Sequence, residues 1–94
     1  MGLGLEESLR LTVAALMQAT GDSQRVIAAV LGLTQTQVSR RQSGATSWTL
    51  RDVDVLAGHY EMTALDLLAG PTRACETLPA TRRRTAGTGQ GAGR

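Results

Sequence analysis

A short stretch near the middle of the chain carries side chains suited to contacts with nucleic acid. It contains no acidic residue, and its polar members include Gln35, Thr36, Gln37, Ser39, Arg40 and Ser43. Glutamine can pair with N6 and N7 of adenine, arginine with O6 and N7 of guanine, and the threonine methyl group can contact that of thymine. Hydroxyl and guanidinium groups also bind phosphate oxygens. These residue types predict non-covalent contacts with base edges and with the DNA backbone.

Helical spacing decides which of these side chains share a face. Val38 is the only apolar residue between positions 35 and 43, so it is expected to hold a helix against the core. The direction opposite Val38 on a helical wheel falls between Thr36 and Arg40, which makes these two residues candidates for base contacts. Ser39 and Ser43 flank that face, where phosphates are the expected partners.

The sequence contains no catalytic or metal-binding constellation. The acidic residues are scattered, and no Ser/His/Asp or Cys/His arrangement or glycine-rich phosphate loop between a strand and a helix is found. His59 has no second metal-type ligand nearby, so it is expected to be a surface residue. The single cysteine, Cys75, excludes an internal disulfide. We therefore do not expect an enzyme, nor a protein that binds a metal, a cofactor or a small-molecule ligand.

The polar stretch is predicted to form the third of five helices. Apolar residues repeat with a helical period over residues 5–19, which predicts the first helix. Ser23 is a suitable N-cap for a second helix. Thr34 and Gln37 have the spacing of a capping box, which places the start of the third helix directly before the polar stretch.

Two further helices are predicted after the polar stretch. Thr49 and Asp52 have capping-box spacing and open a fourth helix, whose predicted buried stripe comprises Leu50, Val53, Leu56, Ala57 and Tyr60. Trp48 is expected to pack against Val53 as a hydrophobic staple. Thr63 opens a short fifth helix. No strand pattern is present, so the expected fold is all-α, a compact five-helix domain.

The charge distribution divides the chain into two parts. Residues 1–70 carry five arginines against seven acidic residues, whereas residues 71–94 carry five arginines against one. The second part is rich in Arg, Gly and Thr and too poor in apolar residues to offset the entropy of ordering. We therefore predict a folded domain over residues 1–70 and a flexible basic tail over residues 71–94. The arginines at 82–84 are either a solvated extension or an auxiliary phosphate contact.

Residues 23–44 resemble the helix-turn-helix of the lambda-repressor and Cro type, the XRE-like family. The resemblance extends over residues 5–70 and is carried by the small Ala28, by Gly32 at the turn and by the apolar anchors Ile27, Leu31, Leu33 and Val38. It implies a lambda-repressor-like helix-turn-helix DNA-binding domain. In this family the residue at the position of Gln24 donates to a phosphate, and Gln35 stands at the helix tip that enters the groove first.

The resemblance also implies a function. It points to a sequence-specific transcriptional regulator, a Cro-like or immunity-type repressor of a phage or mobile element. The partner would be double-stranded operator DNA, contacted in the major groove by a homodimer, with the region of Leu67 and Leu68 as the favoured dimer contact. A host regulator of the same family stays an alternative. The rival class is an antitoxin-like or anti-repressor-like helical module that acts through a protein partner. The net acidic charge of residues 1–70 favours a further alternative, a helical bundle that has this fold but does not bind DNA.

One position departs from the family pattern. The family usually has an apolar residue at the position of Arg41, which lies about 60° from Val38 on the helical wheel, near the core edge. We expect Arg41 to bury its stem and present its charge to a phosphate.

A cytoplasmic location, in a bacterium or a phage-infected host, is expected. No apolar run approaches the roughly 20 residues needed to span a bilayer, so no membrane partner is expected. A single cysteine also fits a reducing compartment.

Overall fold

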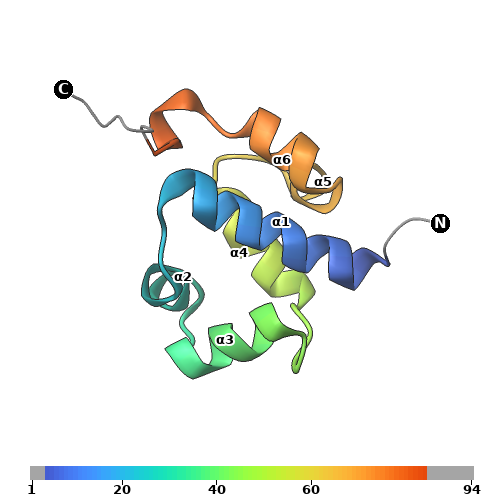
Figure 1. Ribbon diagram of the computed structural model, residues 1–94, viewed down its shortest axis with the longest axis vertical. Helices are drawn as coiled ribbons and strands as arrows, with labels where there is room; N and C mark the ends of the chain where they lie inside the picture. The colour runs from blue at the N-terminus through green and yellow to red at the C-terminus, as the bar shows by residue number, and fades with distance from the viewer. Residues whose placement is uncertain (1–3, 85–94) are drawn as a thin grey trace.

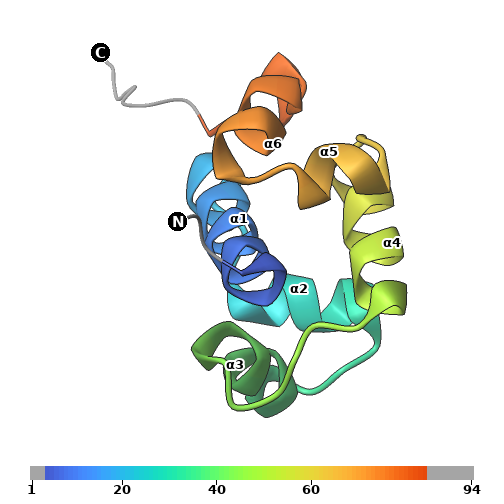
Figure 2. The ribbon, with the colours of Figure 1, turned by 90° about the vertical axis from the view of Figure 1, so that its right-hand side faces the viewer.

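The computed structural model describes residues 4–84, and this part of the chain folds entirely into helices and connecting turns (Figure 1). The all-α prediction is therefore confirmed. The elements in chain order are α1 (Leu5–Thr20), α2 (Gln24–Leu31), α3 (Gln35–Ser43), α4 (Leu50–His59), α5 (Ala64–Leu68), α6 (Pro71–Thr77) and a 3₁₀ turn, η1 (Ala80–Arg82). Figure 2 shows α2 and α3 at one end of the molecule and α5 and α6 at the other, with α1 and α4 between them.

The predicted helix starts are present as hydrogen-bonded caps. Ser23 accepts from the backbone of Val26, and complete capping boxes begin α3, α4 and α5 at Thr34, Thr49 and Thr63. A cap of this kind stabilises a helix by about 1 kcal/mol, because it satisfies backbone N–H groups that the helix leaves free. The short helices therefore begin where local sequence dictates.

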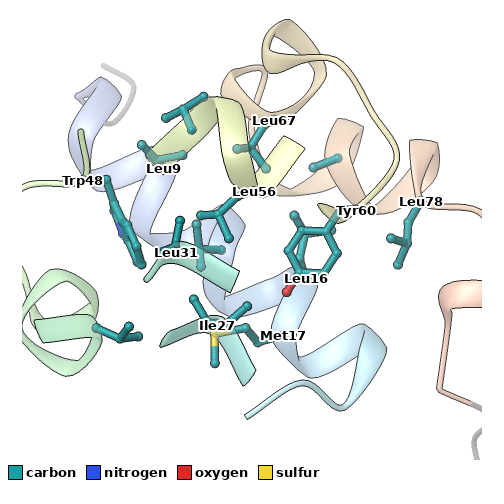
Figure 3. Close-up of a cluster of buried hydrophobic side chains, with 14 of the residues drawn as sticks. Leu9, Leu16, Met17, Ile27, Leu31, Trp48, Leu56, Tyr60, Leu67 and Leu78 are labelled. Carbon is teal, nitrogen blue, oxygen red and sulfur yellow. The ribbon is translucent and has the colours of Figure 1, made fainter. Parts of the chain in front are cut away.

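A mainly aliphatic core fills the space between the helices (Figure 3). Its fully buried side chains include Val13, Leu16, Ile27, Val38 and Leu67. Trp48 is also buried, as the predicted staple requires, but Leu50 is 85 % exposed and does not belong to the buried stripe of α4. Leu50 is the first residue of α4, where the helix begins at the edge of the core, and Trp48 fills the core position at that end.

The segment after Gly70 corrects the predicted domain boundary. Residues 71–84 were expected to belong to a flexible tail, but residues 71–77 form α6, which packs against α1 and α5 (Figures 1 and 2). Ala74 and Leu78 are buried, at 0 % and 3 % exposure. The composition is poor in apolar residues, yet these two are four positions apart and fall on one helical face. Residues 85–94, the rest of the predicted tail, lie outside the described residues.

A polar cluster fastens the end of this segment to the rest of the domain. The Arg82 guanidinium donates to the His59 carbonyl at 2.9 Å and lies 3.7 Å from the Asp22 carboxylate. His59 was expected to be a surface residue, but its side chain is 19 % exposed and its Nε2 lies 2.9 Å from Asp22 Oδ2. Burial, reinforced by the charge of Asp22, raises the pKa of the neighbouring Tyr60 hydroxyl far above its usual value. Tyr60 therefore stays neutral in the core.

Candidate nucleic-acid interface

A tight turn sets the geometry between α2 and α3. Gly32 adopts a left-handed conformation with φ of 71°, and the Leu33 amide donates to the Ala28 carbonyl at 2.9 Å. A residue with a Cβ is strained at this φ, which explains the glycine. Ile27, Ala28, Leu31 and Val38 are buried where the two helices meet the core. The helix-turn-helix geometry expected from residues 23–44 is present.

The outward face of these two helices forms one open depression. It is lined by Gln24, Gln35, Thr36, Ser39 and Arg40, all of which were singled out from sequence. Among the residues of α3, Val38 is buried and Arg41 and Gln42 are half-buried, whereas the other residues are exposed to solvent. The lining contains hydrogen-bond donors and acceptors and one full positive charge, and none of its residues is acidic. Such a surface can contact base edges and phosphates.

Two further predicted residues, Gln37 and Ser43, serve the ends of α3. Gln37 Oε1 accepts from the Thr34 amide at 2.8 Å within the capping box. Ser43 Oγ donates to the Arg40 carbonyl at 3.0 Å and accepts from the Ala45 amide at 3.3 Å. Neither residue lines the depression, so their structural contribution is to fix the length and ends of the helix that carries the others.

Gln24 is held in place by a hydrogen bond to Gln42, which was not predicted from the sequence. Its Nε2 donates to Gln42 Oε1 at 2.7 Å, and Gln42 Nε2 in turn lies 3.3 Å from Met17 Sδ. This bond ties the first turn of α2 to the last turn of α3. The Gln24 side chain therefore has a defined position at the rim of the depression.

Comparison with known families agrees with this geometry. The profile of the BetR domain matches residues 6–88, almost the whole described chain. The chain belongs to the BetR domain family. BetR is a helix-turn-helix-like domain, which agrees with the motif expected at residues 23–44. The matched residues include α6, which agrees with the packing of that helix as part of the domain. No curated protein and no solved structure matches the chain.

In this BetR domain, the Arg41 guanidinium does not face solvent as predicted but forms an ion pair with Asp52. Its Nε lies 2.8 Å from Asp52 Oδ2, and the two side chains are 13 % and 3 % exposed. The same carboxylate oxygen accepts from the Thr49 amide at 3.0 Å, as part of the cap of α4. The expectation that Arg41 presents its charge to a phosphate is therefore wrong. Arg41 instead fixes the end of α3 to the start of α4.

Metal-ligand clusters and membrane-spanning helices are both absent from residues 4–84. Within this part of the BetR domain, no cluster of three or more His, Cys, Asp or Glu residues could hold a metal ion. None of its helices is both long enough and apolar enough to cross a membrane.

Proposed function

We propose that this BetR domain binds double-stranded DNA sequence-specifically by placing α3 in the major groove, and that it regulates transcription. The observation that carries the proposal is the open, acid-free depression lined by Gln24, Gln35, Thr36, Ser39 and Arg40. A helix whose polar face is free while Val38 anchors the opposite face suits insertion into a groove about 12 Å wide.

Each lining residue has a role that follows from its chemistry and place. Gln35, at the N-terminal tip of α3, pairs with adenine, and Arg40 pairs with guanine. Thr36 offers its methyl group to thymine. Ser39 and Gln24 bind phosphates, which positions the domain on the duplex without selecting sequence.

The finer proposal is a Cro-like or immunity-type repressor of a phage or mobile element. It rests on the resemblance of residues 23–44 to the lambda-repressor and Cro type. Regulators of this type act in the cytoplasm on operators with two half-sites about 34 Å apart, contacted by a dimer.

Substitutions in α3 test the proposed base contacts. Arg40→Ala and Gln35→Ala should each cost on the order of 1 to 3 kcal/mol on the preferred site, and each should relax preference at one position per half-site. Selection from a random duplex pool, followed by anisotropy titration of the selected duplex, gives both quantities. Gln24→Ala should weaken all sequences about equally, and Arg73→Ala on α6 is the charge-matched control. Folded Arg40→Ala and Gln35→Ala proteins with undiminished discrimination would contradict the assignment.

The dimer contact proposed from sequence needs revision within α5. Leu67 is fully buried and Leu68 packs partly against the core, whereas Leu65 is 78 % exposed. We therefore place the contact at Leu65, with a second copy as its partner. Leu65→Glu should leave the fold and the binding of a single half-site intact while removing cooperative binding to a two-site duplex. Leu11→Glu, at a 48 % exposed position on α1, is the control, and equal cooperativity in both variants would exclude this interface.

A protein-interaction module is the second candidate, and the exposed leucines favour it. Leu5, Leu50 and Leu65 are each more than half exposed among the described residues. Such a module would bind bulk DNA weakly at every salt concentration. For a DNA-binding domain, log K would instead fall linearly with log[salt], because each phosphate contact releases counterions from the DNA.

A further inference from the structure

The three consecutive arginines at the end of the described chain have different environments. Arg82 is held by the His59 carbonyl and by Asp22. Arg83 donates to the carbonyl of Cys75. Among residues 4–84, no carboxylate lies within ion-pair distance of the Arg84 guanidinium. Arg83 has no carboxylate partner there either, but Arg84 is the arginine of this run whose guanidinium has neither an ion pair nor a hydrogen bond within residues 4–84.

The backbone of Arg84 is fastened beside the turn between α1 and α2. Its amide donates to the Ala19 carbonyl at 2.6 Å, and Figure 1 shows the end of the described chain next to the C-terminal end of α1. The side chain crosses Gly21, whose φ is +80°, and a Cβ at Gly21 would lie 3.2 Å from Arg84 Cδ. The missing side chain at Gly21 thus leaves room for the arginine to lie flat against the turn.

Arg84 lines a second open depression, between α1 and the end of α3. Gln18, Gly21, Asp22 and Gln42 contribute to the same depression. The Asp22 carboxylate lies 2.9 Å from His59 Nε2 and 3.7 Å from the Arg82 guanidinium, and it is not within ion-pair distance of Arg84. Arg84 supplies the positive charge among the residues that line this depression, beside the amides of Gln18 and Gln42.

The two depressions are neighbours. They share no lining residue, but Gln24 belongs to one and Gln42 to the other, and these side chains are hydrogen-bonded at 2.7 Å. A polar surface therefore continues from the face of α3 over the Gln24–Gln42 pair to Arg84.

We infer that Arg84, flanked by Gln18 and Gln42, is a binding site for a DNA backbone phosphate. The inference rests on the proposed DNA binding and extends its footprint. The strand whose phosphate meets Gln24 continues over Gln42 and places a further phosphate against the Arg84 guanidinium. A contact of this kind adds affinity without sequence preference, and each phosphate neutralised adds about 0.9 to the slope of log K against log[salt] on duplex DNA.

Salt-titrated binding of the full chain tests this site. The probes are the duplex selected by the wild type and a random duplex of equal length, and the variants are Arg84→Ala, Arg84→Lys and the control Arg73→Ala. Arg84→Ala should lower the salt slope by about 0.9 on both duplexes and weaken binding about threefold to tenfold near 0.1 M salt. Arg84→Lys should stay close to wild type, and Arg73→Ala should change little, because Arg73 lies on α6 and pairs with Asp66.

Replacing single DNA phosphates by uncharged groups shows which phosphate Arg84 contacts. Methylphosphonate substitution, scanned along the flank of the selected duplex, should find a position that weakens the wild type but not Arg84→Ala. An unchanged slope for Arg84→Ala, with Arg40→Ala still impaired, would overturn this site and leave the proposed function standing. Equal slope losses for Arg84→Ala and Arg73→Ala would reduce the effect to net charge and also overturn it. A wild type that binds neither duplex would remove both proposals.

Discussion

A chain that ends after Gly70 is expected to lose the cooperative unfolding transition of the full chain. Such a truncation removes α6 with its buried Ala74, removes the buried Leu78 that follows the helix, and uncovers the surfaces of α1 and α5 on which α6 packs. Loss of one buried leucine side chain alone typically costs 2 to about 5 kcal/mol. Small domains have a total free energy of unfolding of about 5 to 15 kcal/mol. Removal of the whole helix should therefore consume most of this stability.

Urea denaturation, followed by helical circular dichroism and Trp48 fluorescence, measures this loss. A chain ending after Arg84 is the matched control, because it keeps every described helix, and it should unfold close to the full chain. Leu78→Ala is a milder variant with an expected loss of about 2 to 5 kcal/mol. A chain of residues 1–70 with an unchanged urea midpoint would show that α6 is dispensable. If the truncated chain unfolds as expected, its DNA affinity cannot report what residues 71–94 contribute to binding, because the loss of binding would include the loss of the fold.

Local sequence was sufficient to predict the part of the fold that carries the candidate site. The caps at Ser23 and Thr34 satisfy backbone groups within three residues, so their spacing alone identifies the helix starts. Gly32 and Val38 add a turn and an anchor at fixed offsets. Once those are set, the exposed face of α3 follows from helical geometry.

Contacts between distant residues could not be predicted in this way. Arg41 meets Asp52 across 11 positions and Gln24 meets Gln42 across 18, and no periodicity relates such pairs. The packing of helices decides which side chains come together there. The Gln24–Gln42 and Arg41–Asp52 contacts around α3 were therefore not predicted from the sequence.

The segment containing α6 was missed for a different reason. Its apolar face consists of little more than Ala74 and Leu78, which is too small to stand out in a composition rich in Thr and Arg. Gly70 and Pro71 are typical of a helix end, and α5 does end before them, but proline also fits the first turn of a helix, where its missing N–H is not needed, and Pro71 begins α6. The sequence around Pro71 is thus compatible with a helix end and with a helix start. The packing of α6 against α1 favours the helix, and this contact between distant residues is not visible in the local sequence.

Breaking the pair of Arg41 and Asp52 is expected to be the most damaging single substitution near the site. Asp52 is 2 % exposed, and one oxygen of its carboxylate accepts from both Arg41 Nε and the Thr49 amide. Asp52→Ala would leave the Arg41 charge largely buried without its partner and would also remove the acceptor for the Thr49 amide, which is one half of the capping box of α4. Removal of one member of a buried ion pair typically costs about 3 to 5 kcal/mol. Asp52→Asn keeps an acceptor for Thr49 and should lose less.

The comparison that isolates the pair is a double-mutant cycle measured by urea denaturation. Replacing both members, as Arg41→Leu with Asp52→Ser, should recover much of the loss, because no unpaired charge is then buried and serine can still serve the cap. Asp54→Ala, on the exposed face of α4, should change the free energy of unfolding by no more than about 0.5 kcal/mol. Because the pair fixes the end of α3, the single variants should also weaken DNA binding, even where enough folded protein remains. An equal free energy of unfolding for Asp52→Ala and Asp54→Ala would contradict a stabilising role of the Arg41–Asp52 pair.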